Sequence, residues 1–328
     1  MSRSLAKYAD DFFKHYLSND DINEICYNGG ETLWLQDAYA KWHEEKTILD
    51  LNKALAFGTA CASHKQDQLQ ANKPILSAVL PTGERVQVVI PPVTKKDMIS
   101  ITIRKPSKIH YKIDDYDKDG LFSKIIHETK NKHTPYDIEL KEYYDKGKYK
   151  DFITQAVNFG KNIIIAGATG SGKTTFMKSL IDFIPKSERI ITIEDVEEIK
   201  FYKHKNYVQL FYPSEAKEGD AITPASLLKS CMRMKPDRIL LAELRGAETY
   251  DFLNVINSGH GGSLTSLHAG SVSETFTRLA LMTLQNPQGQ KIPFEVIQKN
   301  LKETIDIVVH FHAHDGKRVI TDIYYKGA

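Results

Sequence analysis

The sequence is poor in cysteine: its 328 residues include only Cys26, Cys61 and Cys231. These cysteines lie far apart and form no CxxC pair, which argues against a disulfide framework and against a cysteine-ligated zinc site. The sequence also lacks any apolar run near the ~18 residues that a membrane-spanning helix needs, and its amino terminus lacks the apolar core of a signal peptide. These absences predict a protein of the reducing cytoplasm, and they leave peripheral attachment to a membrane open.

An excess of charge of either sign is absent as well. Lys and Arg total 44 and Asp and Glu total 42, so the formal net charge at pH 7 is +2. Because contacts with nucleic-acid phosphates need clustered Lys and Arg, this balance argues against direct DNA binding. Charged residues make up 26% of the chain and apolar residues 41%, which is typical of a globular protein, and the length suffices for two domains.

The first third of the chain has the patterns of a small α+β domain. Apolar residues recur at helical spacing in two stretches and alternate as in strands in several others. We expect helices at 5–17 and 49–62, and strands at 22–27, 32–35, 84–90 and 98–104. The segment Lys105-Pro106-Ser107 is predicted to be a hinge, because proline removes a backbone donor and discourages helix before it. The predicted N-terminal domain covers residues 1–106.

The remaining residues, 107–328, have the pattern of an α/β domain. Residues 107–150 are polar and rich in Lys and Tyr, and they are predicted to form a linker with short helical segments. Beyond them, apolar strands alternate with helices, and a hairpin follows. The predicted strands are 162–166, 190–193, 207–211, 238–242 and 263–267, the helices 173–183, 225–233 and 249–256, and the hairpin 307–311 with 319–325. Strands that are apolar throughout are buried on both faces, which indicates a parallel sheet covered by helices.

A phosphate-binding loop stands between the first predicted strand of this domain and its first helix. It fits the pattern G-x-x-x-x-G-K-[ST], followed by a further threonine. Its residues are Gly167, Ala168, Thr169, Gly170, Ser171, Gly172, Lys173, Thr174 and Thr175. The alternative, a glycine-rich turn with an incidental lysine, does not account for the strand before the loop and the helix after it. The loop predicts binding of ATP with Mg²⁺.

Each residue type in this loop has a chemical reason. Gly170 and Gly172 let backbone N–H groups close around phosphate oxygens without a Cβ in the way. The N-terminus of the following helix adds the positive end of its dipole. We expect Lys173 to reach the β- and γ-phosphates and the Thr174 hydroxyl to ligate Mg²⁺.

Two further strands deliver carboxylates to the edge of the sheet that holds this loop. Glu243 ends the strand 238–242 and is predicted to order Mg²⁺, the alternative being a surface glutamate that closes a buried strand. Glu194 and Asp195 end the strand 190–193. Because neighbours on a strand point to opposite faces, one of the pair can face the γ-phosphate while the other turns into the sheet or to a loop amide. Glu194 is the predicted residue for polarising the attacking water, and a solvated loop acid is the alternative.

Histidines stand on or after two of the strands. His268 ends the strand 263–267, where a neutral imidazole can sense the γ-phosphate or relay its loss; a purely structural histidine is the alternative. His310, His312 and His314 alternate along one strand, which invites a metal site. No nearby set of carboxylates or cysteines completes a ligand sphere for them.

Taken together, the motifs resemble those of the hexameric secretion traffic ATPases. Specifically, they resemble those of the ATPase that is the eleventh VirB component of bacterial type IV secretion systems, a relative of the PilT and GspE motors. The family pattern is a Walker A loop, an acidic Asp box, a degenerate Walker B and a His box, found here at 167–174, 190–195, 238–245 and 259–269. The N-terminal segments 22–29, 83–89 and 100–107 match as well, so the resemblance covers most of the chain.

This resemblance implies a C-terminal RecA-like P-loop ATPase domain beside the smaller N-terminal α+β domain. The catalytic residues that it implies are Lys173, Glu194, Glu243, His268, Arg85 and Arg104. Arg85 and Arg104 belong to the N-terminal domain and would contact the nucleotide phosphates across the domain interface, although by themselves they are equally well two solvated basic residues. Loss of the γ-phosphate would then release a charge that holds the interface closed.

The implied protein is a homo-oligomer, in particular a hexamer, peripheral on the inner face of the inner membrane and working with other components of a secretion complex. ATP hydrolysis would power substrate passage through, or assembly of, a type IV secretion channel or pilus. A pilus retraction or type II secretion motor is a second hypothesis, although the GspE branch usually carries a tetracysteine domain and this chain has no such set. A nucleic-acid motor and a nucleotide-gated scaffold with negligible turnover are further alternatives.

Overall fold

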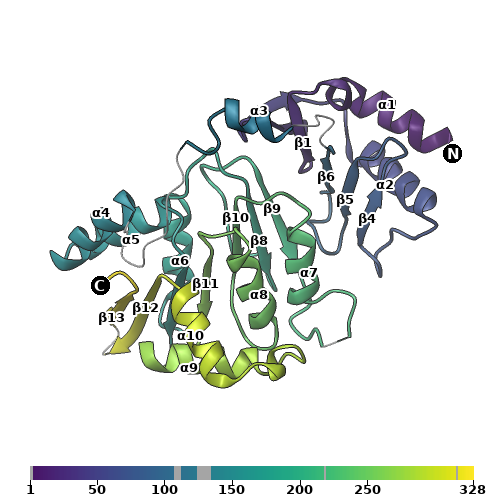
Figure 1. Ribbon diagram of the computed structural model, residues 1–328. Helices are drawn as coiled ribbons and strands as arrows, with labels where there is room; N and C mark the ends of the chain where they lie inside the picture. Colours follow the sequence, from purple (N-terminus) through teal and green to yellow (C-terminus); the bar gives the residue numbers. More distant parts are fainter. Residues whose placement is uncertain (1–2, 107–111, 124–133, 218, 315–316) are drawn as a thin grey trace.

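The computed structural model describes residues 3–106, 112–123, 134–217, 219–314 and 317–328. This described part of the chain forms two β-sheets, one of six strands near the N-terminus and one of seven strands beyond it (Figure 1). The arrangement confirms the predicted fold class, an α/β C-terminal domain beside a smaller α+β N-terminal domain. None of the helices built by these residues is long and apolar enough to cross a bilayer.

The N-terminal sheet is antiparallel, with the strand order β3-β2-β1-β6-β5-β4. Its elements are α1 (Arg3–Ser18), β1 (Ile22–Tyr27), β2 (Thr32–Asp37), β3 (Trp42–Lys46), α2 (Leu51–Lys65), β4 (Ile75–Val79), β5 (Arg85–Val89) and β6 (Ser100–Arg104). Phe13 of α1 and Phe57 of α2 pack with strand residues such as Val88 in one apolar core. Asp50 begins α2, because its side chain accepts a hydrogen bond from the backbone N–H of Lys53 at 2.8 Å.

The C-terminal sheet has the order β13-β12-β7-β11-β10-β8-β9. Its neighbours pair in parallel except for β12 and β13, which form the predicted antiparallel hairpin. The strands are β7 (Ile163–Gly167), β8 (Ile190–Glu194), β9 (Tyr207–Phe211), β10 (Arg238–Leu241), β11 (Leu264–Leu267), β12 (Ile307–His314) and β13 (Lys317–Tyr325).

Helices lie on both faces of this sheet (Figure 1). They are α4 (Pro135–Asp145), α5 (Tyr149–Asn158), α6 (Lys173–Ile181), α7 (Pro224–Cys231), α8 (Glu248–Asn257), α9 (Val272–Thr283) and α10 (Phe294–Thr304). Along β7, Ile163 and Ile165 join one apolar core while Ile164 and Ala166 join the other. Burial on both faces explains why the central strands are apolar throughout.

Part of the predicted linker belongs to the core of the C-terminal domain. Tyr144 of α4 donates from its hydroxyl to the backbone oxygen of Ile323 at 2.9 Å, and its ring centroid lies 5.6 Å from that of Tyr325. The short helix α3 (Ile113–Lys118) precedes these helices in the chain. The predicted domain boundary at 106 follows β6 directly and stays a prediction, because Ser107 is outside the described residues.

A buried arginine connects the two domains. Arg189 donates from Nε to the backbone oxygen of Met234 at 2.9 Å, and from Nη1 to the side-chain oxygens of Asn28 at 2.8 Å and Asn206 at 2.6 Å. Its guanidinium carbon also stands 5.8 Å from the ring centroid of Trp42. Because Asn28 and Trp42 belong to the N-terminal domain, these contacts fix how the two sheets sit against each other.

Candidate active site

The phosphate loop follows β7 at the carboxyl edge of the C-terminal sheet. Gly167, Gly170 and Gly172 have φ angles of 151°, 76° and 96°, a region that glycine enters without a steric penalty. A Cβ added to Gly170 would meet nothing within 4 Å, so this part of the loop is open to a ligand. Ser171 is buried, and its hydroxyl has no hydrogen-bond partner among the described residues.

A cavity of about 280 Å³ lies beside this loop. It is lined by Thr169, Gly170, Gly172, Lys173, Thr174, Thr175, Glu243, Ser266, His268 and Arg318. The structure therefore brings the predicted lysine, the two threonines, the Walker B glutamate and the histidine to one place. Ala168 lies at a second hollow that adjoins the first through Thr169 and His268 and extends to α9.

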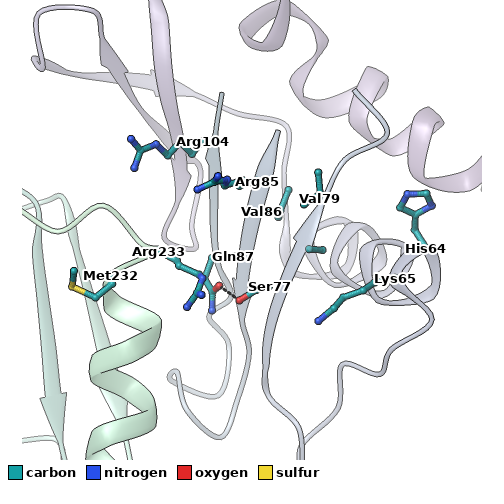
Figure 2. Close-up of a pocket in the computed structure, with 11 residues that line it drawn as sticks. His64, Lys65, Ser77, Val79, Arg85, Val86, Gln87, Arg104, Met232 and Arg233 are labelled. Atoms are coloured by element: carbon teal, nitrogen blue, oxygen red, sulfur yellow. Dashed lines mark hydrogen bonds between the residues drawn. The ribbon is translucent and has the colours of Figure 1, made fainter. Parts of the chain in front are cut away.

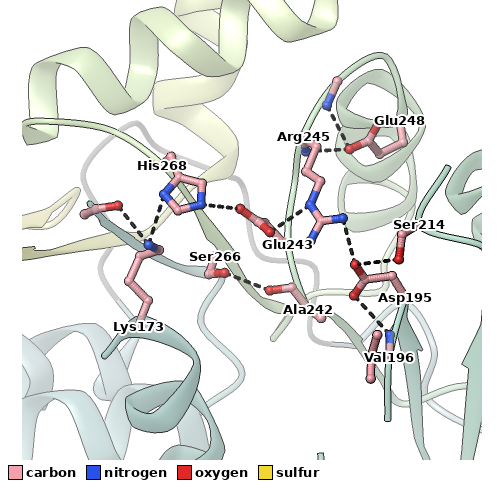
Figure 3. A network of polar contacts seen from close by, with 12 residues as sticks. Lys173, Asp195, Val196, Ser214, Ala242, Glu243, Arg245, Glu248, Ser266 and His268 are labelled. Carbon is pink, nitrogen blue, oxygen red and sulfur yellow. Dashed lines mark hydrogen bonds and ion pairs between the residues drawn. The ribbon is translucent and has the colours of Figure 1, made fainter. Parts of the chain in front are cut away.

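Lys173 lines this cavity and is held by the loop itself (Figure 3). Its Nζ donates to the backbone oxygens of Gly167 at 2.9 Å and Ala168 at 2.8 Å, and lies 3.2 Å from Nδ1 of His268. Burial lowers the pKa of Lys173 from its ordinary value, while the charge of Glu243 acts in the opposite direction. A nucleotide phosphate would exchange these neutral carbonyl partners for a charged one.

Two carboxylates and an arginine continue from His268 in a chain of polar contacts. His268 Nε2 lies 2.8 Å from Oε1 of Glu243, and Oε2 of Glu243 accepts from Nε of Arg245 at 2.8 Å. Arg245 Nη1 then donates to Oδ2 of Asp195 at 2.7 Å. Although burial acts to lower it, the hydrogen bonds that Arg245 donates to Glu243 and Asp195 raise the pKa of Arg245. Figure 3 shows that the chain links the phosphate loop, β11, β10 and the end of β8.

Glu194 does not join this chain. Its carboxylate is fully buried and accepts four hydrogen bonds, from Thr192 Oγ1 at 2.6 Å, Gln209 Nε2 at 3.0 Å and the backbone N–H groups of Glu198 at 2.9 Å and Ile199 at 2.8 Å. The prediction was that Glu194 faces the γ-phosphate and Asp195 turns away, and the two side chains are oriented the other way round. Glu194 turns to the loop amides, whereas its neighbour Asp195 joins the polar chain through Arg245.

Arg85 and Arg104 line a separate cavity of about 540 Å³ (Figure 2). They stand opposite each other on β5 and β6, and Nε of Arg104 lies 3.5 Å from Oε1 of Glu24. This cavity is also lined by His64, Lys65 and Arg233, which follows α7. No residue of the phosphate loop lines it. Within one chain, the structure therefore does not bring the two arginines to the loop.

Two arginines at the site were not among the predicted residues. Arg245 comes two positions after Glu243 in Glu-Leu-Arg, a spacing that could have placed both on the same side. Arg318 belongs to the C-terminal hairpin, far away in the sequence, and no local pattern predicted that it would reach the site.

His310, one of the histidines considered for a metal site, is buried and bonds to Thr321 Oγ1 at 2.7 Å and to the backbone oxygen of Ala269 at 3.2 Å. In the described ranges no group of three or more His, Cys, Asp or Glu is placed to hold a metal ion.

A parallel sheet with a strand–phosphate loop–helix unit, and with a lysine, a histidine and a carboxylate gathered at its edge, defines the P-loop class of nucleoside triphosphatases. Residues 51–312 match the family described as Type II/IV secretion system protein, and the chain belongs to this family. It is an ATPase, as its relatives and the family match indicate.

Proteins of type IV secretion systems are similar over nearly the whole chain. The type IV secretion system protein VirB11 of Brucella abortus (strain 2308) is 47% identical over 315 residues, which cover 94% of this chain and 87% of that protein. PtlH of Bordetella pertussis (strain Tohama I) is 38% identical over 317 residues, 95% of this chain and 92% of that protein. The crystal structure of the VirB11 ATPase of Brucella suis in complex with sulphate has a TM-score of 0.92 at 44% identity, covering 99% of this chain and 95% of that one.

Proposed function

We propose that this ATPase is the ring-forming, hexameric motor of a type IV secretion system, in which ATP hydrolysis drives substrate passage or assembly of the channel or pilus. The relatives named for type IV secretion align with both domains, which supports this function over pilus retraction, type II secretion or a nucleic-acid motor. The observation that carries the proposal is the polar chain Lys173–His268–Glu243, which joins the phosphate loop to the Walker B strand.

In this proposal each residue of the cavity has a distinct task. Lys173 leaves the carbonyls of its own loop for the β- and γ-phosphates, and loop amides 167–175 hold the remaining phosphate oxygens. The Thr174 hydroxyl and the Glu243 carboxylate line the same cavity, and this hard oxygen pair fits Mg²⁺, which would neutralise charge on the β- and γ-phosphates. His268 lies between Lys173 and Glu243, where it would report whether the γ-phosphate is bound.

Glu194 is assigned a positioning role. By accepting two backbone N–H groups of the following loop, it fixes the turn in which Asp195 meets Arg245. Glu243, the carboxylate nearest to the phosphate loop in the polar chain, takes the part of polarising the attacking water. In this assignment Glu194 stabilises the loop and Glu243 takes part in hydrolysis.

The nucleotide-contacting arginines are proposed to come from a neighbouring subunit. Arg85 and Arg104 line a cavity that no phosphate-loop residue shares, while the hollow at Ala168, Thr169 and α9 leaves the loop open at its edge. A ring would place the arginine cavity of one subunit against the open loop of the next. An arginine at a γ-phosphate raises the rate by roughly 10³–10⁵ in other P-loop enzymes.

Mixed rings test this arrangement. Arg85→Ala/Arg104→Ala subunits and Lys173→Ala subunits should each have little ATPase activity alone. When the two are mixed and allowed to exchange subunits, some interfaces combine an intact loop with intact arginines, so activity should return to a substantial fraction of wild type. A Lys173→Ala/Arg85→Ala/Arg104→Ala subunit is the matched control and should restore nothing. If the first mixture stays inactive although rings form, the arginines act within one chain.

We further propose that the motor lies at the inner face of the inner membrane, attached peripherally and bound to other components of the secretion complex. The support is the name of its relatives as parts of type IV secretion systems. Fractionation of cells with and without the remaining secretion components is the test: the protein should leave the membrane fraction when those partners are absent or when high salt is added.

A further inference from the structure

Arg318 of β13 is a basic residue at the phosphate loop that the mechanism above does not use. It lines the same cavity as Lys173 and Thr174. Its Cδ, Nε and Nη1 lie 2.9, 3.2 and 3.3 Å from the position that a Cβ on Gly172 would take. The side chain is exposed, and it makes no hydrogen bond or ion pair with any residue that the structure describes. A guanidinium over the start of α6 is therefore available to a ligand.

The hairpin that carries Arg318 is fixed against the loop by packing. β12 runs parallel to β7 with Phe311 opposite Gly167, and a Cβ on Gly167 would stand only 2.4 Å from the backbone oxygen of Phe311. The ring of Phe311 also packs on Phe176 of α6, with centroids 4.9 Å apart. Because backbone and ring both hold the hairpin here, Arg318 is placed beside the loop by a packed element.

The sheet order decides which end of a nucleotide Arg318 would meet. β11 and β10, which lead to His268 and Glu243, lie on one side of β7, whereas β12 and β13 lie on the other. Lys173, whose Nζ is 3.2 Å from His268, marks the first side as that of the γ-phosphate. A nucleotide bound along the loop then extends its α-phosphate toward the second side, where Arg318 stands over Gly172.

We propose that Arg318 binds the α-phosphate of the bound nucleotide, and thus the diphosphate that ATP and ADP share. The inference rests on the proposed role of the phosphate loop and adds a contact from the opposite side of the sheet. Because the contact is the same before and after hydrolysis, it contributes to binding of the ground state and the transition state equally. Arg318 thereby sets how tightly the motor holds ADP, which determines how readily the site empties after each turnover.

The test compares three variants with wild type by nucleotide titration and steady-state kinetics. Arg318→Ala should weaken binding of ADP and of a non-hydrolysable ATP analogue by similar factors, about tenfold for loss of a charge-assisted hydrogen bond, and should raise KM with kcat unchanged or increased. Arg318→Lys should restore part of the affinity, because a charge remains without the fork geometry. Lys317→Ala, which removes a charge from the same hairpin but does not line the cavity, should behave as wild type.

Three results would overturn the inference. In Arg318→Ala, they are an unchanged affinity for both nucleotides, a weaker affinity for the ATP analogue alone, and a lower kcat at unchanged affinity. Lys173→Ala separates this from the proposed function, since it should abolish binding whether or not Arg318 takes part. If Lys173→Ala binds nucleotide like wild type, the loop is not the site and both proposals fail together. Equal melting temperatures of the variants without nucleotide show that the hairpin is intact.

Discussion

At the scale of single residues, Glu194 and Glu243 show how burial separates two similar carboxylates. Glu194 is surrounded by four donors and has no exposed surface. Glu243 keeps contact with the cavity and with two basic partners, His268 and Arg245. Removing the charge of the first should therefore disturb folding, and removing the charge of the second should disturb hydrolysis.

Isosteric amides distinguish the two roles. In Glu194→Gln one acceptor oxygen becomes an NH₂ group facing other donors, so we expect the free energy of unfolding to fall by about 1–3 kcal/mol and kcat to stay within about threefold of wild type at a temperature where the variant is folded. Glu243→Gln should reduce kcat by roughly 10²-fold or more with a small change in melting temperature. Thermal melting and phosphate release measure both quantities.

A reversed pattern would restore the original assignment of the water-polarising residue. A Glu194→Gln protein that melts like wild type but hydrolyses ATP a hundredfold more slowly cannot be explained by a buried structural carboxylate. Glu197→Gln, an exposed carboxylate in the same loop, controls for the loss of one negative charge there.

Glu24 is a second carboxylate whose surroundings determine its protonation. Burial raises its pKa to about 7, against the attraction of Arg104, Lys235 and Arg189, which acts to lower it. In the unfolded chain a glutamate titrates near pH 4.3. The folded state therefore binds the proton more tightly, and the resulting stability is fully present below the unfolded pKa and is lost as the pH rises through about 7.

Replacement of Glu24 by an uncharged isostere should remove this pH dependence. Relative to wild type, Glu24→Gln should gain about 1–3 kcal/mol in free energy of unfolding between pH 5 and pH 8. Denaturant unfolding at the two pH values measures the difference, with the exposed Glu31→Gln as control. A constant difference between variant and wild type at both pH values would contradict the raised pKa.

The gathering of Lys173, Glu243 and His268 could be predicted from the sequence, because the carboxyl ends of parallel strands meet at one edge. The orientation of Glu194 could not. Alternation along a strand shows that Glu194 and Asp195 face apart, but not which faces the site. The orientation of Glu194 is determined by hydrogen-bond donors from other elements, such as Gln209 of β9, whose positions depend on the folded sheet.

At the scale of elements, apolar pattern and burial explain what could be predicted. β1 and β9 occur at the predicted residues, β7, β8, β10 and β11 differ by one residue at their ends, and the two hairpin strands are two to three residues longer than predicted. β3 was not predicted because its sequence, Trp-His-Glu-Glu-Lys, lies at a sheet edge and is largely exposed. No element was predicted between 268 and 306, where α9 and α10 pack on the sheet. Edge strands and helices such as α9 and α10 depend on contacts with distant parts of the chain. Local apolar periodicity does not predict such contacts.

At the scale of the whole molecule, the placement of the two domains depends on contacts between residues far apart in the sequence. Trp42 donates from Nε1 to Oδ2 of Asp237 at 2.8 Å, and the same oxygen accepts from the backbone N–H of Arg189 at 2.7 Å. The separation of Arg85 and Arg104 from the phosphate loop follows from this docking. It was not predictable from the motifs, which describe each domain alone.

Loss of this docking should be visible in the shape of the protein. Trp42→Ala removes the indole from Asp237 and from the Arg189 guanidinium, so we expect the free energy of unfolding to fall by roughly 2 kcal/mol and the radius of gyration to increase. Thermal melting and small-angle scattering are the measurements, and Tyr39→Ala, in the turn before β3 and 85% exposed, is the control. An unchanged scattering profile would show that the remaining contacts suffice.

The division between the loop cavity and the arginine cavity also bears on how a cell conserves its ATP. If Arg85 and Arg104 act on the site of a neighbouring subunit, as we propose, a free subunit would bind ATP without arginines at its own phosphate loop. Unassembled subunits would then hydrolyse ATP slowly, and the specific ATPase activity would rise with protein concentration until assembly is complete. ATP hydrolysis would therefore be confined to assembled oligomers.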